Sequence, residues 1–281
     1  MPFLHIKPVP DPNRTLPEYS QPPVIETVLG VQFSPLTSFS IPHFGLYWAK
    51  IRDTYPEYEI QPPLGPVIEE FGEGQWKRAG VSVEIASFPE IRCWFKDASG
   101  TKLIQVQKDR FLFNWRKVKD EDVYPHYENI KPNFTEKWEE FCLFLVEAGL
   151  EKPEVNQCEV TYVNHIDRGQ GWRSYGELKK VIAGWSGEIS GSFLPDPESV
   201  NIGTRYVLPN GKGRLHVLMQ PAIRRTDAKE ILQLNLTARG KPESSNLRHL
   251  LEWLDVGHEW IVRGFTDFTT RAMHDLWGRK I

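Results

Sequence analysis

Polar residues that alternate with apolar ones in strand-like segments are the residues of this chain best able to bind or react. In the strand predicted over residues 155–166, Glu159 and His165 fall on one side, and Cys158 and Val160 fall on the other. Glu159 and His165 are nevertheless roughly 20 Å apart along an extended strand. They cannot form a catalytic pair by themselves. The segment therefore predicts either a solvated face or a surface that neighbouring strands complete.

A second polar side follows the predicted strand that ends in Asn-Trp-Arg. Arg110, Asn114 and Arg116 alternate with aromatic residues that are typical of a core. If the strands are adjacent, Glu26 or Glu159 can neutralise these arginines, which gives the segment a structural interpretation. The alternative is a basic, amide-rich face that binds a ligand.

Polar residues also alternate in two later predicted strands, over residues 214–219 and 231–239. An antiparallel sheet with one polar face is common, so these residues fit either interpretation. Asn164 differs because it interrupts an apolar side, where a buried amide must be hydrogen-bonded. It belongs either to a structural network or to a ligand contact. The candidate binding residues are Glu26, Arg110, Asn114, Arg116, Glu159, Asn164, His165, Arg214, His216 and Asn235.

The sequence contains none of the motifs that would assign a catalytic, metal or nucleotide site. Gly211-Lys212-Gly213 lies at a predicted hairpin tip and lacks the rest of a phosphate-binding loop. His258 and Glu259 have no second histidine at helical spacing, as a zinc site would require. Cys142 lies among large apolar residues with no activating charge beside it. We therefore predict no catalytic residue, no metal and no cofactor.

Composition places the chain in a broad class. Its 281 residues carry a formal net charge of −3, so bulk charge indicates neither a nucleic acid nor an anionic membrane as partner. The 3 cysteines form no closely spaced pair, which is typical of free thiols in a reducing compartment. No apolar run approaches the roughly 18 residues of a membrane span, and the start resembles no signal peptide. We expect a cytoplasmic protein that does not enter the membrane.

The order of predicted elements divides the chain into a leader and two similar halves. Residues 1–21 are rich in proline and form the leader. The half over 22–152 is predicted as a strand, a helix opening at Pro42, several strands, and a helix over 134–149. Residues 61–74 are predicted as a loop. The predicted strands are 24–33, 81–88, 91–96, 102–106 and 110–116.

The half over 153–281 repeats this order. It begins with the strand over 155–166 and a short helix over 175–185, and continues with strands over 200–208, 214–219 and 231–239. A helix over 246–277 closes it, predicted to break near Gly257 or Gly264, with Thr266 capping the last piece. The expected fold is α+β, with antiparallel sheets and helices on one face. A saddle like that of the TATA-box-binding protein and a helix-grip fold both use this order. The halves are expected to form one compact unit.

Five stretches resemble a sporadically distributed, uncharacterised family of bacterial proteins of about this length. The most specific is the run ending in Asn114-Trp115-Arg116. The resemblance implies no activity, since none is established for the family. The family's patchy occurrence implies a phage-defence or toxin-type gene context. The stretches are residues 22–26 (PPVIE), Gln105 with 109–116 (DRFLFNWR), 124–128 (YPHYE), 162–166 (YVNHI), and Trp277-Gly278 after a helix containing Phe265.

Together these features lead us to expect a non-enzymatic protein that binds a protein partner or a second copy of itself. A nucleic-acid-binding saddle is the first alternative. It is less favoured because such sheets expose apolar wedges or aromatic residues, whereas here the aromatic residues alternate onto the core side. The second alternative is a small-ligand binder or an enzyme that uses the polar face around Glu159, His165 and Arg110.

Overall fold

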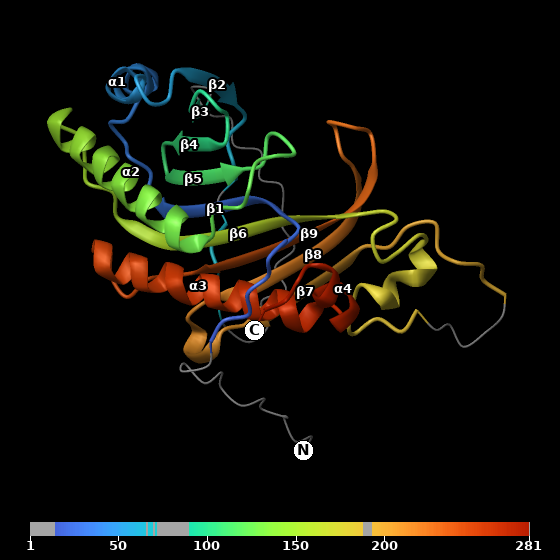
Figure 1. The fold of residues 1–281 in the computed structure, drawn as a ribbon. Coiled ribbons are helices and arrows are strands. Elements are labelled where there is room, and N and C mark those ends of the chain that lie inside the picture. The colour runs from blue at the N-terminus through green and yellow to red at the C-terminus, as the bar shows by residue number, and fades with distance from the viewer. Residues whose placement is uncertain (1–14, 66, 70, 72–89, 188–192, 281) are drawn as a thin grey trace.

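A single antiparallel sheet forms the centre of the molecule. The computed structural model describes residues 15–65, 67–69, 71, 90–187 and 193–280. Within these residues nine strands pair in the order β2-β3-β4-β5-β1-β6-β9-β8-β7 (Figure 1). The chain is thus an α+β protein with one large sheet. The strands are β1 (Val24–Phe33), β2 (Glu57–Gln61), β3 (Arg92–Lys96), β4 (Lys102–Gln107), β5 (Arg110–Arg116), β6 (Val155–Asp167), β7 (Ile202–Val207), β8 (Arg214–Ile223) and β9 (Glu230–Gly240).

The two strands that open the predicted halves lie side by side in the middle of this sheet. β1 pairs with β6, and the sheet continues outward from β1 through β5, β4, β3 and β2. From β6 it continues outward through β9, β8 and β7. The boundary between residues 152 and 153 falls just before β6, so the sheet is continuous across it.

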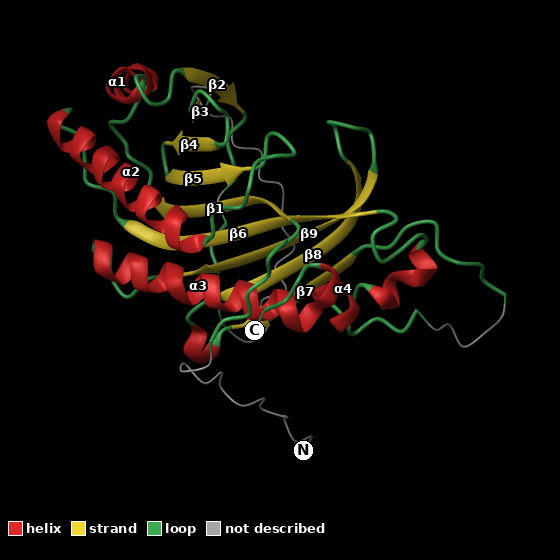
Figure 2. Ribbon diagram, viewed as in Figure 1, coloured by secondary structure: helices red, strands yellow, loops and turns green. Residues whose placement is uncertain are grey.

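Helices cover one face of the sheet (Figure 2). They are α1 (Ile41–Ile51), α2 (Tyr127–Glu147), α3 (Leu247–Phe268) and the short α4 (Arg271–Leu276). From α2, the Phe141 ring stacks on Phe111 of β5 with centroids 5.2 Å apart. α3 packs on β6, β9 and β8. Large aromatic side chains are buried in this layer, among them Phe33, Phe111 and Phe141, and they contribute a large apolar contact area.

α3 contains both glycines at which a break was expected, and it continues through them. A Cβ at Gly257 would lie 3.0 Å from Cγ2 of Val160, and one at Gly264 would lie 2.6 Å from Cδ2 of Leu215. The glycines therefore allow the helix to approach the sheet closely. The predicted break and the predicted cap at Thr266 are wrong. The helix ends at Phe268, and Thr270 caps α4 by accepting a hydrogen bond from the Met273 N–H.

Other predicted elements differ in their limits. α2 begins at Tyr127 rather than at residue 134, and it continues through Pro132, which lacks a backbone N–H. β2 was not predicted, because it is a short edge strand whose residues are mostly exposed. The predicted helix over 175–185 is a shorter 3₁₀ helix, Tyr175–Lys180. The predicted strand over 81–88 lies outside the described residues.

The described part of the proline-rich leader packs against the C-terminal end of the chain. The Tyr19 side chain is buried, and its hydroxyl lies 2.8 Å from Oγ1 of Thr266 on α3. The backbone N–H of Ser20 donates to the Gly278 carbonyl at 3.0 Å. Residues 15–21 therefore belong to the folded body.

Two further observations concern membrane-spanning helices and the state of the cysteines. Among the helices in the described ranges, none combines the length and the apolar character that crossing a membrane requires. Cys93, Cys142 and Cys158 are free thiols.

Candidate functional site

The face of the sheet opposite α2 and α3 is lined by alternate, mostly polar side chains, and we refer to it as the polar sheet face. The strand register assigns residues to it, since every second residue points the same way. All predicted binding residues except Asn164 lie on it. Asn164 lies on the helix-covered side and donates from Nδ2 to the Leu234 carbonyl at 3.0 Å. The members of this face among the predicted residues are Glu26, Arg110, Asn114, Arg116, Glu159, His165, Arg214, His216 and Asn235.

Amide side chains and one arginine form a straight row across the polar sheet face. Gln107 of β4 pairs in register with Arg110 of β5, which pairs with Gln32 of β1, which pairs with Gln157 of β6. All four side chains are buried. A carboxamide offers an N–H donor and a carbonyl acceptor, the same groups as a peptide bond. The row is therefore equipped to bind the backbone of an extended chain.

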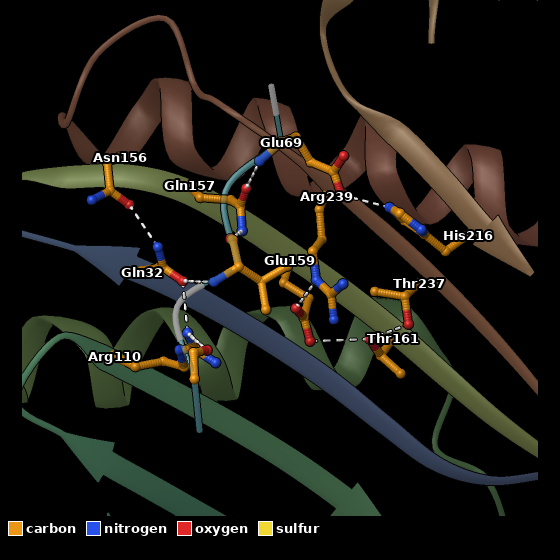
Figure 3. Close-up of polar contacts among 12 residues, drawn as sticks. Gln32, Glu69, Arg110, Asn156, Gln157, Glu159, Thr161, His216, Thr237 and Arg239 are labelled. Carbon is orange, nitrogen blue, oxygen red and sulfur yellow. Dashed lines mark hydrogen bonds and ion pairs between the residues drawn. The ribbon is translucent and has the colours of Figure 1, made fainter. Parts of the chain in front are cut away.

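The chain's own residues 64–71 lie across this row, and we refer to them as the crossing segment, of which residues 66 and 70 are outside the description. The Leu64 N–H donates to Oε1 of Gln107 at 2.8 Å, and Nε2 of Gln107 donates back to the Leu64 carbonyl at 3.0 Å. Arg110 donates to the Gly65 carbonyl at 3.1 Å. Oε1 of Gln32 accepts from Arg110 at 2.6 Å and from the Val67 N–H at 3.4 Å (Figure 3).

Gln157 repeats the pattern at the far end of the row. Its Nε2 donates to the Val67 carbonyl, and its Oε1 accepts from the Glu69 N–H at 3.0 Å (Figure 3). From β4 to β6 the row spans three strand spacings, or about 14 Å. The chain from Leu64 to Glu69, at about 3.3 Å per residue, reaches about 16 Å when extended. The described residues Leu64, Gly65, Val67 and Glu69 therefore follow the row across the strands.

The Glu69 side chain fixes the end of the crossing segment to β8. It is only 7% exposed, and its carboxylate accepts from Nη1 of Arg214 at 2.6 Å and lies 2.5 Å from Nε2 of His216. Burial raises the pKa of Glu69, but its hydrogen bonds with His216 and Arg214 outweigh that effect and hold it below its usual value. The Arg214 guanidinium also lies 4.4 Å from the centroid of the Phe71 ring. The sequence predicted Arg214 and His216 as binding residues but did not indicate Glu69 as their partner.

Beside this cluster, Glu159 is neutralised by a neighbour on β9. Arg239 donates from Nε to its carboxylate, and the Thr161 hydroxyl donates to it at 3.2 Å (Figure 3). The predicted pairing of Glu159 with Arg110 or Arg116 is therefore replaced by a pair with Arg239. Burial lowers the pKa of the Arg110 guanidinium, although Asp109 and Glu159 act in the opposite direction.

A second network of hydrogen bonds crosses the other half of the polar sheet face. Nδ2 of Asn114 donates to Glu26 at 2.6 Å, and Nε2 of Gln105 donates to Oδ1 of Asn114 at 2.9 Å. Trp94 donates to Gln105 at 2.9 Å. Burial raises the pKa of Glu26, while Asn114 and Arg116 oppose that shift. Arg116 itself donates to the Gly100 carbonyl from Nε and Nη2.

His165 stands apart from both networks. Its Nδ1 is buried and finds no hydrogen-bond partner within the described ranges. Burial lowers its pKa, with Arg224 acting in the same direction. Asn235 accepts a hydrogen bond from Gln233 at 3.2 Å. The structure thus brings Arg110, Arg214 and His216 to the crossing segment, but leaves His165 separate from Glu159.

Two observations concern metal and thiol chemistry in the described part of the chain. In the described ranges, no group of histidine, cysteine, aspartate and glutamate residues has the geometry to hold a metal ion. Burial raises the pKa of Cys93 to about 11 and that of Cys142 to about 12, so both thiols stay protonated near neutral pH and are poor nucleophiles. The observed contacts instead pair polar side chains with an extended backbone.

Comparisons of the chain with protein-family models, with curated proteins and with solved structures found no match.

Sequence reasoning missed the residues that hold the crossing segment. Gln32, Gln107 and Gln157 were not proposed as binding residues, and residues 61–74 were predicted only as a loop. The available signal was that Gln32 and Gln107 lie near the C-terminal ends of their strands, whereas Arg110 and Gln157 lie near the N-terminal ends of theirs. This signal becomes readable only when the strand order and register are known.

Proposed function

We propose that this chain is a non-enzymatic binding protein whose polar sheet face holds an extended polypeptide. The observation that supports this most strongly is the row of Gln107, Arg110, Gln32 and Gln157, which binds the backbone of the crossing segment. In this proposal the segment is a built-in occupant, and a protein partner presents a similar extended stretch. The partner is another protein or a second copy of the chain.

The contacts favour a polypeptide over a nucleic acid. A phosphate accepts hydrogen bonds and requires cations or N–H donors, whereas the glutamines use their carbonyl groups as well as their N–H groups. Glu26 and Glu159 also place carboxylates on this face. A nucleic-acid-binding saddle therefore stays the alternative, and its affinity would fall steeply with salt because bound counterions are released.

We propose in addition that the two series of strands, over residues 22–152 and 153–281, are pseudo-repeats that together form a saddle. The outward order of strands from β1 and from β6, and the helices on one face, support this view. The resemblance to a sporadically distributed bacterial family supports a place in a phage-defence or toxin-type system, where binding another gene product is the proposed role.

A peptide-binding experiment tests the proposed function. Residues 64–71 are replaced by a glycine-serine linker of equal length, and a fluorescein-labelled peptide of residues 61–71 is titrated by anisotropy. The emptied face is expected to bind the peptide saturably, and the unchanged protein to bind it at least about tenfold more weakly, because its own segment competes. Adding Gln157→Leu should weaken binding about fivefold to tenfold.

Gln170→Leu is the matched control, since Gln170 is exposed in a turn away from the row. The proposal is contradicted if the emptied variant fails to bind the peptide while its circular dichroism shows a folded protein. Equal binding by the unchanged protein would also contradict it. Tight, salt-dependent binding of single- or double-stranded DNA without peptide binding would favour the alternative.

A further inference from the structure

The helix-covered side of the sheet contains a cavity that the polar sheet face does not use. It has a volume of about 420 Å³ and lies between the sheet, α3, the start of α2 and residues 16–22. Volumes of this size are typical of small-molecule sites. Its exposed lining residues are His126, Glu128 and Asn129, so it opens to solvent beside the first turn of α2.

A chain of three polar side chains forms one wall of the cavity. The Tyr124 hydroxyl donates to the Tyr162 hydroxyl at 2.8 Å, and the Tyr162 hydroxyl lies 2.9 Å from Nδ1 of His258. A hydroxyl carries a single proton. With Tyr124 donating to Tyr162, the arrangement that places one proton between each neighbouring pair has Tyr162 donating to Nδ1, and the proton of the neutral imidazole is then on Nε2.

With the donors in this order, hydrogen-bond acceptors are left unused on the side of the cavity. The Tyr124 oxygen gives its proton to Tyr162 and keeps lone pairs that can accept a hydrogen bond. Asn164 also lines the cavity: one proton of its Nδ2 goes to the Leu234 carbonyl, and its Oδ1 can accept a hydrogen bond from a ligand. A ligand that satisfies both groups must itself carry N–H or O–H donors.

The charges around the cavity also favour a ligand that carries N–H or O–H donors. The charged residues among its described lining are Glu18 and Glu128, and no lysine or arginine is among them. Glu18 already pairs with Lys280 at 2.8 Å, so Glu128 is the carboxylate at the entrance that the ligand would meet. The remaining walls are largely aromatic or aliphatic, including Phe265 and Leu236. Aromatic faces attract cations and planar rings.

The backbone at the entrance is held in a conformation that L-residues rarely adopt. His126 has φ 62° and ψ 159°, and it directly precedes α2. This conformation costs free energy, and residues held in this way are concentrated at ligand sites. It places Tyr124 on one side of the turn, while Tyr127 on the other side stacks on His258 with ring centroids 3.9 Å apart. The turn thus positions both aromatic walls.

We propose that this cavity is a binding site for a small organic amine with a planar, apolar body. In the bound state the ammonium or amino N–H groups donate to Tyr124 and Asn164, Glu128 lies near the positive charge, and the ring packs against the aromatic walls. The site is independent of the polar sheet face, so neither proposal requires the other. The competing hypothesis is that the cavity binds an anion at the start of α2, where helix N–H groups carry partial positive charge.

Isothermal titration with three matched probes tests this proposal. Tryptamine carries the ring and the amine, indole carries the ring alone, and indole-3-propionate carries the ring with a carboxylate. Tryptamine is expected to bind at micromolar to low millimolar concentration, at least about tenfold more tightly than either comparison probe. Tyr124→Phe keeps the ring but removes the oxygen, and should weaken tryptamine binding about fivefold to tenfold.

A variant that fills the cavity provides the second measurement. Val262→Phe adds a ring at a lining position of α3 and should abolish tryptamine binding without changing the circular dichroism. Val146→Phe, at an exposed position of α2 outside the cavity, should bind like the unchanged protein. The proposal is overturned if tryptamine does not bind at millimolar concentration, if indole-3-propionate binds as tightly, or if Val262→Phe binds tryptamine normally.

Discussion

The two faces of the sheet use the same strands in different ways. β6 supplies Gln157 and Glu159 to the polar sheet face, and Tyr162 and Asn164 to the cavity on the helix-covered side. On the first face most of the polar side chains, though not Nδ1 of His165, form hydrogen bonds with the chain's own crossing segment or with neighbours on adjacent strands. On the second, the hydroxyl groups and His258 satisfy one another and leave space beside them. The polar sheet face is thus suited to an extended backbone, whereas the cavity on the helix-covered side is suited to a compact molecule.

The largest expected effect comes from removing the centre of the cavity wall. Tyr162→Ala deletes a buried ring and both hydrogen bonds of its hydroxyl. The free energy of unfolding should fall by about 3–5 kcal/mol in urea titration, as for other buried aromatic residues. Tyr58→Ala, on an exposed edge-strand residue, is the control and should cost less than about 1 kcal/mol. Similar losses for the two variants would show that the Tyr162 wall is not part of the core.

Glu69→Ala should detach the crossing segment while leaving the cavity intact. The buried carboxylate holds both Arg214 and His216, so its loss is expected to cost about 1–3 kcal/mol locally. Limited proteolysis should cut within residues 64–71 about tenfold faster than in the unchanged protein. Glu198→Ala, at an exposed position, should leave the rate unchanged. Unchanged cleavage in Glu69→Ala would mean that the glutamine row (Gln107, Gln32 and Gln157, with Arg110) holds the segment without help from Glu69.

The cavity side should be the more sensitive to acid. Burial lowers the pKa of His258 to about 4, with Asp255 opposing and Lys131 reinforcing the shift. The unfolded chain binds a proton near the ordinary value of 6.5, so unfolding takes up protons in this interval. Stability is therefore retained above pH 6.5 and lost as the pH falls toward 4, by roughly 1–2 kcal/mol after allowance for partial solvent exposure. In His258→Asn, urea midpoints should change less over this interval; an equally steep decline would assign the acid sensitivity to other groups.

The smallest expected effect is on the glutamine row. Gln107→Leu removes a reciprocal pair of hydrogen bonds with Leu64 on a partly solvated face. The free energy of unfolding should fall by only about 1 kcal/mol, because water replaces part of what is lost. Hydrogen exchange of the Leu64 amide should rise more clearly than global stability falls. A loss above about 3 kcal/mol would show that the row is a structural element of the core.

Sequence patterns were sufficient to predict most of the strands in the sheet. Alternation identified the strands that became β1, β5, β6, β8 and β9, and it assigned Arg110 and Asn114 to a polar side and Asn164 to an apolar side. Alternation works because each strand has one face under helices and one without them. It did not reveal β2, whose residues are mostly exposed, or the continuity of α3 through Gly257 and Gly264. Those features depend on close approach between elements, which no local pattern contains.

For the candidate sites too, the sequence predicted some features and only the structure revealed the others. The sequence identified arginine, amide and histidine residues that share one face, because that property follows from a period of two along each strand. It did not show that Gln107, Gln32 and Gln157 fall in one row. Nor did it show that residues separated along the chain line one cavity, among them Pro22, Val24, Tyr124, Tyr162, Asn164 and Phe265.

By itself, then, the sequence determined the α+β class, the main strands and which of their side chains share a face. Strand order, register and the path of the crossing segment were decided only by the tertiary structure. The physical reason is that periodicity is a local property of the backbone, whereas the glutamine row and the Tyr124–Tyr162–His258 chain arise from contacts between residues distant in sequence. Such contacts depend on how whole elements pack, and only the folded chain brings them together.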